Sequence, residues 1–292
     1  MWILWSFLAG LMGTAYVSVN QFFKIPAGGL MVFSGLGGAL ILMPFLFLSI
    51  PKVNTEFYLF CILQGINVGY LNNRFLNAAK KYGAQTTAML QPLSVVGTFF
   101  LWLLINPIVF MEYVKYPILS FGITVCLMGI VISVFFLRKQ KDSAQVFKAL
   151  FIPLCALTLS DVLNKKAMQA VYGEMLPAII YYCFIVAFFS GISNVSILLK
   201  DKSLLMSKKT WIGGGCLIIL WIFMMFFKNL AMKYGSNPAY ISALIISTSF
   251  SVVIFNEICH FFKPQYASKV RTNPKVLFLL LICVVGLVVL TS

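Results

Sequence analysis

Ten apolar segments dominate this chain, and each is about 17 to 25 residues long, enough to cross a hydrocarbon core of about 30 Å as a helix. They cover residues 2–23, 28–49, 56–79, 84–105, 116–137, 147–171, 175–199, 210–232, 237–261 and 274–291. A helix satisfies its own backbone hydrogen bonds in lipid. Charged residues make up only 10% of the chain, against roughly 25% in a soluble domain. The sequence therefore predicts an all-α, polytopic, multi-pass protein of the cell membrane with ten transmembrane helices.

The net charge of +15 arises mostly from lysine and arginine residues in the connections between these segments. The odd-numbered connections carry fifteen of these cations, and the even-numbered connections carry three. Because cytoplasmic loops are enriched in Lys and Arg, this bias predicts cytoplasmic odd connections and both termini outside. The cations thus indicate topology, and no nucleic-acid partner is predicted.

Two stretches of seven residues, 77–83 and 229–235, nearly repeat each other 152 positions apart. The first reads Asn-Ala-Ala-Lys-Lys-Tyr-Gly and the second reads Asn-Leu-Ala-Met-Lys-Tyr-Gly. A charged run at 138–143 leaves five apolar segments on either side. We therefore expect a first five-helix repeat at 1–140 and a second at 141–292. An odd number of crossings per repeat inverts the second copy relative to the first, and inverted repeats are typical of transporters.

The Ala-x-Lys-Tyr-Gly turns at 79–83 and 231–235 resemble the endings of the third and eighth helices in the drug/metabolite transporter (DMT) superfamily, in its EamA-like ten-helix branch. Residues 13–17 (Gly-Thr-Ala-Tyr-Val) are similar to the family's opening motif, and residues 255–257 (Phe-Asn-Glu) lie where another motif closes helix nine. The resemblance implies transport of amino acids or related metabolites. It also implies cytoplasmic termini, opposite to the charge bias, so the sequence leaves the orientation open.

Polar side chains recur at helical spacing within three of the apolar segments. They are Gln64, Asn67, Tyr70, Arg74 and Asn77 in the third segment, Gln91 and Ser94 in the fourth, and Tyr240 and Ser247 in the ninth. Steps of three and four residues keep neighbouring members on a shared helix face. Because polar groups are costly in lipid, such a face is expected to line a cavity or to contact another helix. We predict that these residues bind a substrate, with interhelical hydrogen bonding as the alternative.

Charged residues inside the segments suggest a second feature of the site. Arg74 and Lys228 lie just before the two copies of the repeated stretch, and the offset of 152 maps Arg74 onto Phe226, two residues from Lys228. We predict that both contribute to substrate binding and favour an anionic group, since a guanidinium can bind a carboxylate through two hydrogen bonds. The alternative is that both side chains reach the membrane interface. Lys165 follows Asp161 by four residues, which predicts an ion pair within one helix, either structural or coupled to protons.

Catalytic and metal-binding motifs are absent from the sequence. The seven cysteines form no CxxC pair, and the one histidine, His260, lies near the end of the ninth segment. An enzyme, a metal site and a cofactor are therefore not predicted. We expect a secondary transporter, able to act as a monomer, that moves a small polar organic solute by alternating access; proton coupling is left open. A flippase of a lipid-linked or amphiphilic solute and a non-transporting membrane scaffold are the alternatives.

Overall fold

The computed structural model describes residues 1–23, 27–82, 91–137, 143–195, 208–247 and 274–291, and these residues are almost entirely helical. The helices in chain order are α1 (Trp2–Phe23), α2 (Ala27–Val32), η1 (Phe33–Gly37), α3 (Gly38–Leu42), η2 (Met43–Phe47), α4 (Thr55–Tyr82), α6 (Pro92–Ile105), α7 (Pro107–Lys115), α8 (Pro117–Leu137), α9 (Ser143–Gln169), α10 (Met175–Ile192), α13 (Lys208–Tyr234), α14 (Pro238–Ser247) and α16 (Pro274–Thr291). Each predicted apolar segment thus contains at least one helix. The motif at 255–257 and His260 lie outside the described residues.

Four helical stretches in the described part of the chain are long and apolar enough to cross a membrane: Gly29–Phe47, Phe147–Gln169, Met175–Ile192 and Thr210–Tyr234. The bent pair α6 and α7 makes a fifth if it counts as one span. Shorter apolar helices cover Trp2–Tyr16, Pro117–Ser133 and Phe278–Leu290. The expected all-α membrane protein is therefore confirmed, whereas the count of ten spans stays a prediction.

The connection expected at 106–115 contains a helix of its own, α7, which turns by 104° from α6. Proline occupies the first position of both α7 and α8, so the preceding residues are Asn106 and Tyr116. A residue before proline is pushed out of the α-helical region, and both have non-helical dihedrals, with φ of −124° and −118°. These two X-Pro steps break the chain on either side of α7.

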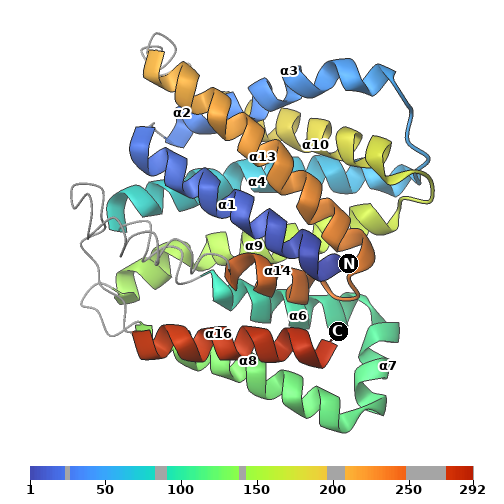
Figure 1. The fold of residues 1–292 in the computed structure, drawn as a ribbon, viewed down its shortest axis with the longest axis vertical. Coiled ribbons are helices and arrows are strands. Elements are labelled where there is room, and N and C mark those ends of the chain that lie inside the picture. Colours follow the sequence, from blue (N-terminus) through green and yellow to red (C-terminus); the bar gives the residue numbers. More distant parts are fainter. Residues whose placement is uncertain (24–26, 83–90, 138–142, 196–207, 248–273, 292) are drawn as a thin grey trace.

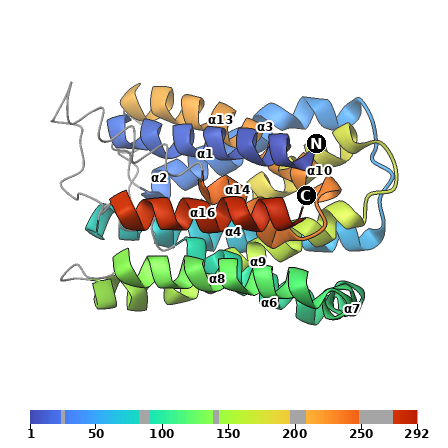
Figure 2. The ribbon, with the colours of Figure 1, turned by 60° about the horizontal axis from the view of Figure 1, so that its bottom comes forward.

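The long helices run along one common direction and form a bundle (Figures 1 and 2). Both termini lie at the same end, which we call the terminal end (Figure 1). α1 and α4 run away from the terminal end, whereas α9 and α13 run towards it (Figure 1). The helices on either side of residue 140 that occupy the same place in their half thus point in opposite directions.

Helices from the two halves of the chain pack in a matched pattern. α1 packs against α13 and α14, and α9 packs against α4 and α6. α4 contacts α10, while α13 contacts η1, α2 and α3. α8 pairs with α16 at the edge of the bundle (Figure 2). The core is therefore built mainly across the boundary between the halves rather than within each half.

The backbones of η1 and α10 approach each other closely. A Cβ added at Gly35 would lie 2.5 Å from the Gly191 Cα, and a Cβ added at Gly191 would lie 2.7 Å from the Leu36 N. No side chain fits at either position, because real Cβ atoms do not approach backbone atoms this closely. The glycines of the second segment thus serve helix packing, as small residues commonly do in membrane proteins.

Candidate functional site

An ion pair joins two helices inside the bundle. The Lys228 Nζ on α13 lies 2.8 Å from the Asp161 Oδ1 on α9, with 14% and 2% of the two side chains exposed. The Ser242 hydroxyl on α14 donates to the other carboxylate oxygen, Oδ2, at 2.7 Å. Three helices of the second half therefore meet at one carboxylate, and both of its oxygens accept a hydrogen bond from a side chain.

This arrangement corrects the predicted partner of Asp161, which is Lys228 and not Lys165. The buried Lys165 ammonium donates instead to backbone carbonyls at the end of α13, to Met232 O at 2.6 Å and to Gly235 O. The last carbonyls of a helix lack intrahelical donors and carry partial negative charge. They therefore bind Lys165, although the i+4 spacing alone predicts that Lys165 pairs with the Asp161 carboxylate.

A second lysine makes the converse contact. The Lys233 Nζ, near the end of α13, donates to Val171 O at 2.6 Å and to Met168 O at 3.3 Å, at the end of α9. α9 and α13 both run towards the terminal end (Figure 1). Their C-terminal ends are thus joined by two lysines, and each lysine caps the helix to which it does not belong.

Several buried polar atoms beside the ion pair have no hydrogen-bond partner. They are both Nδ2 and Oδ1 of Asn164 on α9 and Asn229 Oδ1 on α13, and Gln64 on α4 and the Tyr182 hydroxyl on α10 lie beside each other. Asn164 follows Asp161 by three residues and so lies on the same side of α9. The Tyr182 hydroxyl lies near Gln64 and within electrostatic range of Asp161. We call Gln64, Asn164, Tyr182 and Asn229 the polar cluster.

Unpartnered polar groups of this kind are costly, at about 1–3 kcal/mol for each one left buried. Most buried polar groups in folded proteins are hydrogen-bonded, so exceptions call for a reason. Here four helices, α4, α9, α10 and α13, contribute to one cluster, and both donors and acceptors are present. The polar cluster therefore offers both donors and acceptors to a solute or to water molecules.

The predicted polar stripe of the third segment divides between two environments. Gln64 Nε2 donates to the Ser160 hydroxyl at 2.6 Å, and Asn67 Nδ2 donates to Ala156 O at 2.7 Å, so both side chains contact α9. Further along α4, the Arg74 guanidinium lies 5.5 Å from the Tyr70 ring centre, and both side chains are exposed. At 100° per residue, Arg74 is rotated by only about 20° from Asn67, so the difference between them comes from their distance along α4 rather than from the face of the helix.

Asn77 continues this divided stripe outside the bundle core. Its side chain is exposed and donates to Asn73 Oδ1 at 2.8 Å, and Asn73 in turn donates to Asn194 Oδ1 at 3.1 Å. Arg74 and Lys228, expected to act together, are thus placed differently: Lys228 is bound to Asp161 while Arg74 is exposed.

The predicted residues of the fourth and ninth segments lie elsewhere in the bundle. Gln91 precedes α6, and its carbonyl accepts a hydrogen bond from the Ser94 hydroxyl at 2.7 Å. Tyr240 is buried, and its hydroxyl contacts the Tyr113 hydroxyl on α7. Ser247 ends α14, and its side chain lies outside the described residues. These residues do not join the polar cluster.

Sequence reasoning missed Ser160, Asn164, Tyr182 and Ser242, and it quoted Asn229 only as part of the repeated stretch. All five are polar residues inside apolar segments, which is itself a signal of function or interhelical contact. Comparison with known protein families gives no match, and a search of curated proteins gives no significant match. The resemblance to the drug/metabolite transporters therefore stays a prediction.

Proposed function

We propose that this chain is a secondary transporter that moves a small polar organic solute, such as an amino acid or a related metabolite, across the cell membrane by alternating access. The observation that carries the proposal is the polar cluster with its unpartnered atoms beside the Asp161–Lys228 ion pair. Polar groups within membrane-spanning helices are rare and mark solute or ion pathways. A solute with donors and acceptors would supply the partners that the protein itself does not.

The helix pairing supports an inverted repeat, with halves at 1–140 and 141–292. In order, the ten segments contain α1, α2 to η2, α4, α6, α8, α9, α10, α13, α14 and α16. Exchanging each helix of the first half with its counterpart in the second turns α1–α13 into α9–α4, and α1–α14 into α9–α6, and both resulting pairs are in contact. Counterparts also point in opposite directions (Figure 1). In transporters with such repeats the solute site lies between the copies.

The polar cluster spans that boundary, since Gln64 belongs to the first half and the other three members belong to the second. The Gln64–Ser160 and Asn67–Ala156 hydrogen bonds cross the boundary about one helical turn apart on α9. A change from one access state to the other would therefore rearrange groups that contact the solute. Because Asp161 neutralises Lys228, a preference for anionic solutes would require this ion pair to open.

A ligand-stability screen tests the proposal. The purified chain is heated in the presence of pools of amino acids, organic acids and other polar metabolites, because a ligand at 100 times its Kd stabilises the fold by about 2.7 kcal/mol. Solutes that raise the Tm are then tested for uptake into proteoliposomes. If the chain is a transporter, the proteoliposomes should take up at least one of these solutes, whereas a non-transporting scaffold should give no uptake.

Asn164→Leu makes the test specific to the polar cluster. Asn164 has no side-chain hydrogen bond to lose, and leucine has a similar size, so the variant should fold with an unchanged or raised Tm. Solute binding should nevertheless weaken by about tenfold or more, since the lost partner is worth about 1–3 kcal/mol. Asn54→Leu, at an exposed asparagine, is the matched control. Full binding by Asn164→Leu would place the solute elsewhere.

A further inference from the structure

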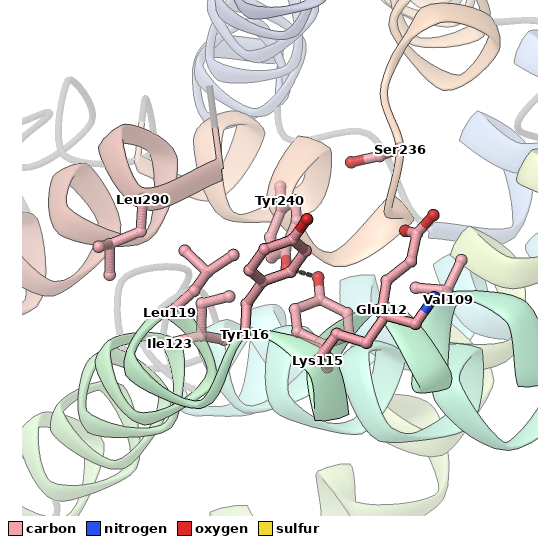
Figure 3. A pocket seen from close by; sticks show the side chains of 10 residues that line it. Val109, Glu112, Lys115, Tyr116, Leu119, Ile123, Ser236, Tyr240 and Leu290 are labelled. Carbon is pink, nitrogen blue, oxygen red and sulfur yellow. Dashed lines mark hydrogen bonds between the residues drawn. The ribbon is translucent and has the colours of Figure 1, made fainter.

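A pocket of about 480 Å³ lies at the terminal end of the bundle, away from the polar cluster. α7 and α8 supply one side of it, and α14, the turn before it and α16 supply the other. Figure 3 shows the pocket from close by. Tyr113 and Tyr240 both line it, and their hydroxyls are in contact. The pocket is therefore formed by both halves of the chain.

The position of α7 places this pocket at the surface of the membrane. α7 turns by 104° from α6 and lies across the bundle, and Figure 2 shows it nearly end-on while the long helices run sideways. A helix perpendicular to membrane-spanning neighbours lies along the membrane plane. Its apolar residues Ile108 and Val114 are 74% and 60% exposed, as expected for a helix that contacts acyl chains.

α7 contributes one negatively charged and one positively charged side chain to the lining of the pocket. Glu112 and Lys115 are exposed, follow each other by three residues and form no salt bridge with each other. In Figure 3 the Glu112 carboxylate extends towards Ser236 on the opposite side. A carboxylate can bind an ammonium group, and a lysine can bind a phosphate. The pair can thus bind a ligand that carries both groups.

Tyrosine rings add a surface for a quaternary or primary ammonium. Tyr113, Tyr116 and Tyr240 line the pocket, and the Tyr113 ring packs edge-on against Phe99 at 5.5 Å. The ring faces of aromatic residues attract cations, and tyrosine is enriched at the level of lipid headgroups. Leu119 and Leu290 complete the lining on α8 and α16, two helices whose outer sides expose Ile118, Phe121 and Val289.

We propose that this pocket binds the headgroup of a zwitterionic phospholipid. Lys115 binds the phosphate, Glu112 and the tyrosine rings bind the ammonium, and the acyl chains extend along the apolar outer sides of α8 and α16. A volume of about 480 Å³ falls within the range of small-molecule sites, about 300–1,000 Å³. The proposal depends on the membrane location of the bundle and not on transport.

Native mass spectrometry of the purified full chain tests this proposal, because it counts bound lipid directly and does not depend on stability. The probes are phosphatidylcholine, the anionic lipid phosphatidylglycerol, and glycerophosphocholine, which has the headgroup without acyl chains. We expect phosphatidylcholine to bind most tightly. Glu112→Gln should weaken it by about tenfold, because the quaternary ammonium, which has no N–H to donate, loses its coulombic attraction to the carboxylate, and should not weaken phosphatidylglycerol. Lys115→Gln should weaken both lipids.

Glu56→Gln and Lys52→Gln are the matched controls. Both residues are exposed; Glu56 lies in the first turn of α4 and Lys52 lies three residues before that helix, at the same end of the bundle but outside the pocket. They should retain the parent's lipid preference. Equal binding of phosphatidylcholine by Glu112→Gln and the parent would overturn the proposal. Tight binding of glycerophosphocholine with no added affinity from acyl chains would also overturn it, in favour of a soluble zwitterion.

Discussion

Lys165 and Lys233 each cap the helix that carries the other. Lys165, on α9, donates to Met232 O at the end of α13, and Lys233, on α13, donates to Met168 O in the last turn of α9 and to Val171 O two residues beyond it. Both helices end at the same level, so their closing turns are joined through two ammonium groups. The Lys-Tyr-Gly sequence at 233–235 thus has a structural role: Lys233 caps α9, and the Gly235 carbonyl accepts from Lys165.

Lys165→Met is expected to lower the free energy of unfolding by about 1–3 kcal/mol, because hydrogen bonds from a charged group are lost and buried carbonyls are left without donors. Lys233→Met should cost less, since Lys233 is only half-buried. Thermal unfolding in detergent measures both effects. Lys52→Met, at an exposed lysine near the same end, is the control. Equal unfolding temperatures for Lys165→Met and the parent would show that these caps do not stabilise the bundle.

Gly35→Ala and Gly215→Ala are expected to change stability in opposite directions. At Gly35 a methyl group collides with the backbone of Gly191, so forced separation of η1 and α10 should cost about 1–3 kcal/mol. At Gly215, within α13, nothing lies within 4 Å of the added carbon, and alanine should raise helix stability by about 0.5–1 kcal/mol. Unfolding temperatures of the two variants, measured side by side, test the prediction. A similar fall in both would mean that loss of glycine itself, and not the collision, is responsible.

Much of the fold could be predicted from the sequence because apolar length and helix formation are tied together in a membrane. The bounds of α1, α8 and α16 agree with their predicted segments within a few residues. α7 was not predicted because residues 106–115 contain charged residues and begin with an X-Pro step, and this combination is typical of a connection between helices. A second X-Pro step lies at the start of α8. Two such steps ten residues apart could have indicated that the residues between them form a separate element.

The candidate site was harder to predict, because helical spacing says which side chains share a face but not which helix that face contacts. Gln64 and Asn67 make the interhelical hydrogen bonds that were the alternative to substrate binding, whereas Asp161 was assigned the nearest lysine in sequence. Its partner is Lys228, which lies on α13, 67 residues away in the sequence. Only the packing of α13 against α9 brings the two together, and no local pattern encodes that packing.

Arg74→Lys is expected to leave solute affinity within about twofold of the parent, since exposed substitutions usually change free energies by no more than about 0.5 kcal/mol. Arg74 lies over the Tyr70 ring and is exposed, apart from the polar cluster. Titration of any solute that the stability screen identifies provides the measurement. A large loss of affinity in Arg74→Lys, with Asn164→Leu unaffected, would restore the guanidinium as the binding group and remove the polar cluster from that role.

Asp161→Asn is expected to lower the free energy of unfolding by about 3–5 kcal/mol, the usual cost of leaving one partner of a buried ion pair without its counter-charge. The Lys228 ammonium would lose its acceptor, while an asparagine oxygen can still accept from Ser242. Lys228→Met should also destabilise the chain, because it leaves the carboxylate charged and buried. Thermal unfolding of the parent, both single variants and the double variant forms a double-mutant cycle.

The double variant decides between the two roles of this ion pair. If the pair is structural, Asp161→Asn combined with Lys228→Met removes both charges at once and should recover much of the stability that either single change loses. If Asp161 instead carries a coupling proton, Asp161→Asn imitates its protonated form. Stability would then be nearly intact, and solute uptake into proteoliposomes would lose its dependence on a pH gradient. We expect the structural result, since the Asp161 carboxylate accepts hydrogen bonds on both oxygens from α13 and α14, and releasing it would separate three helices.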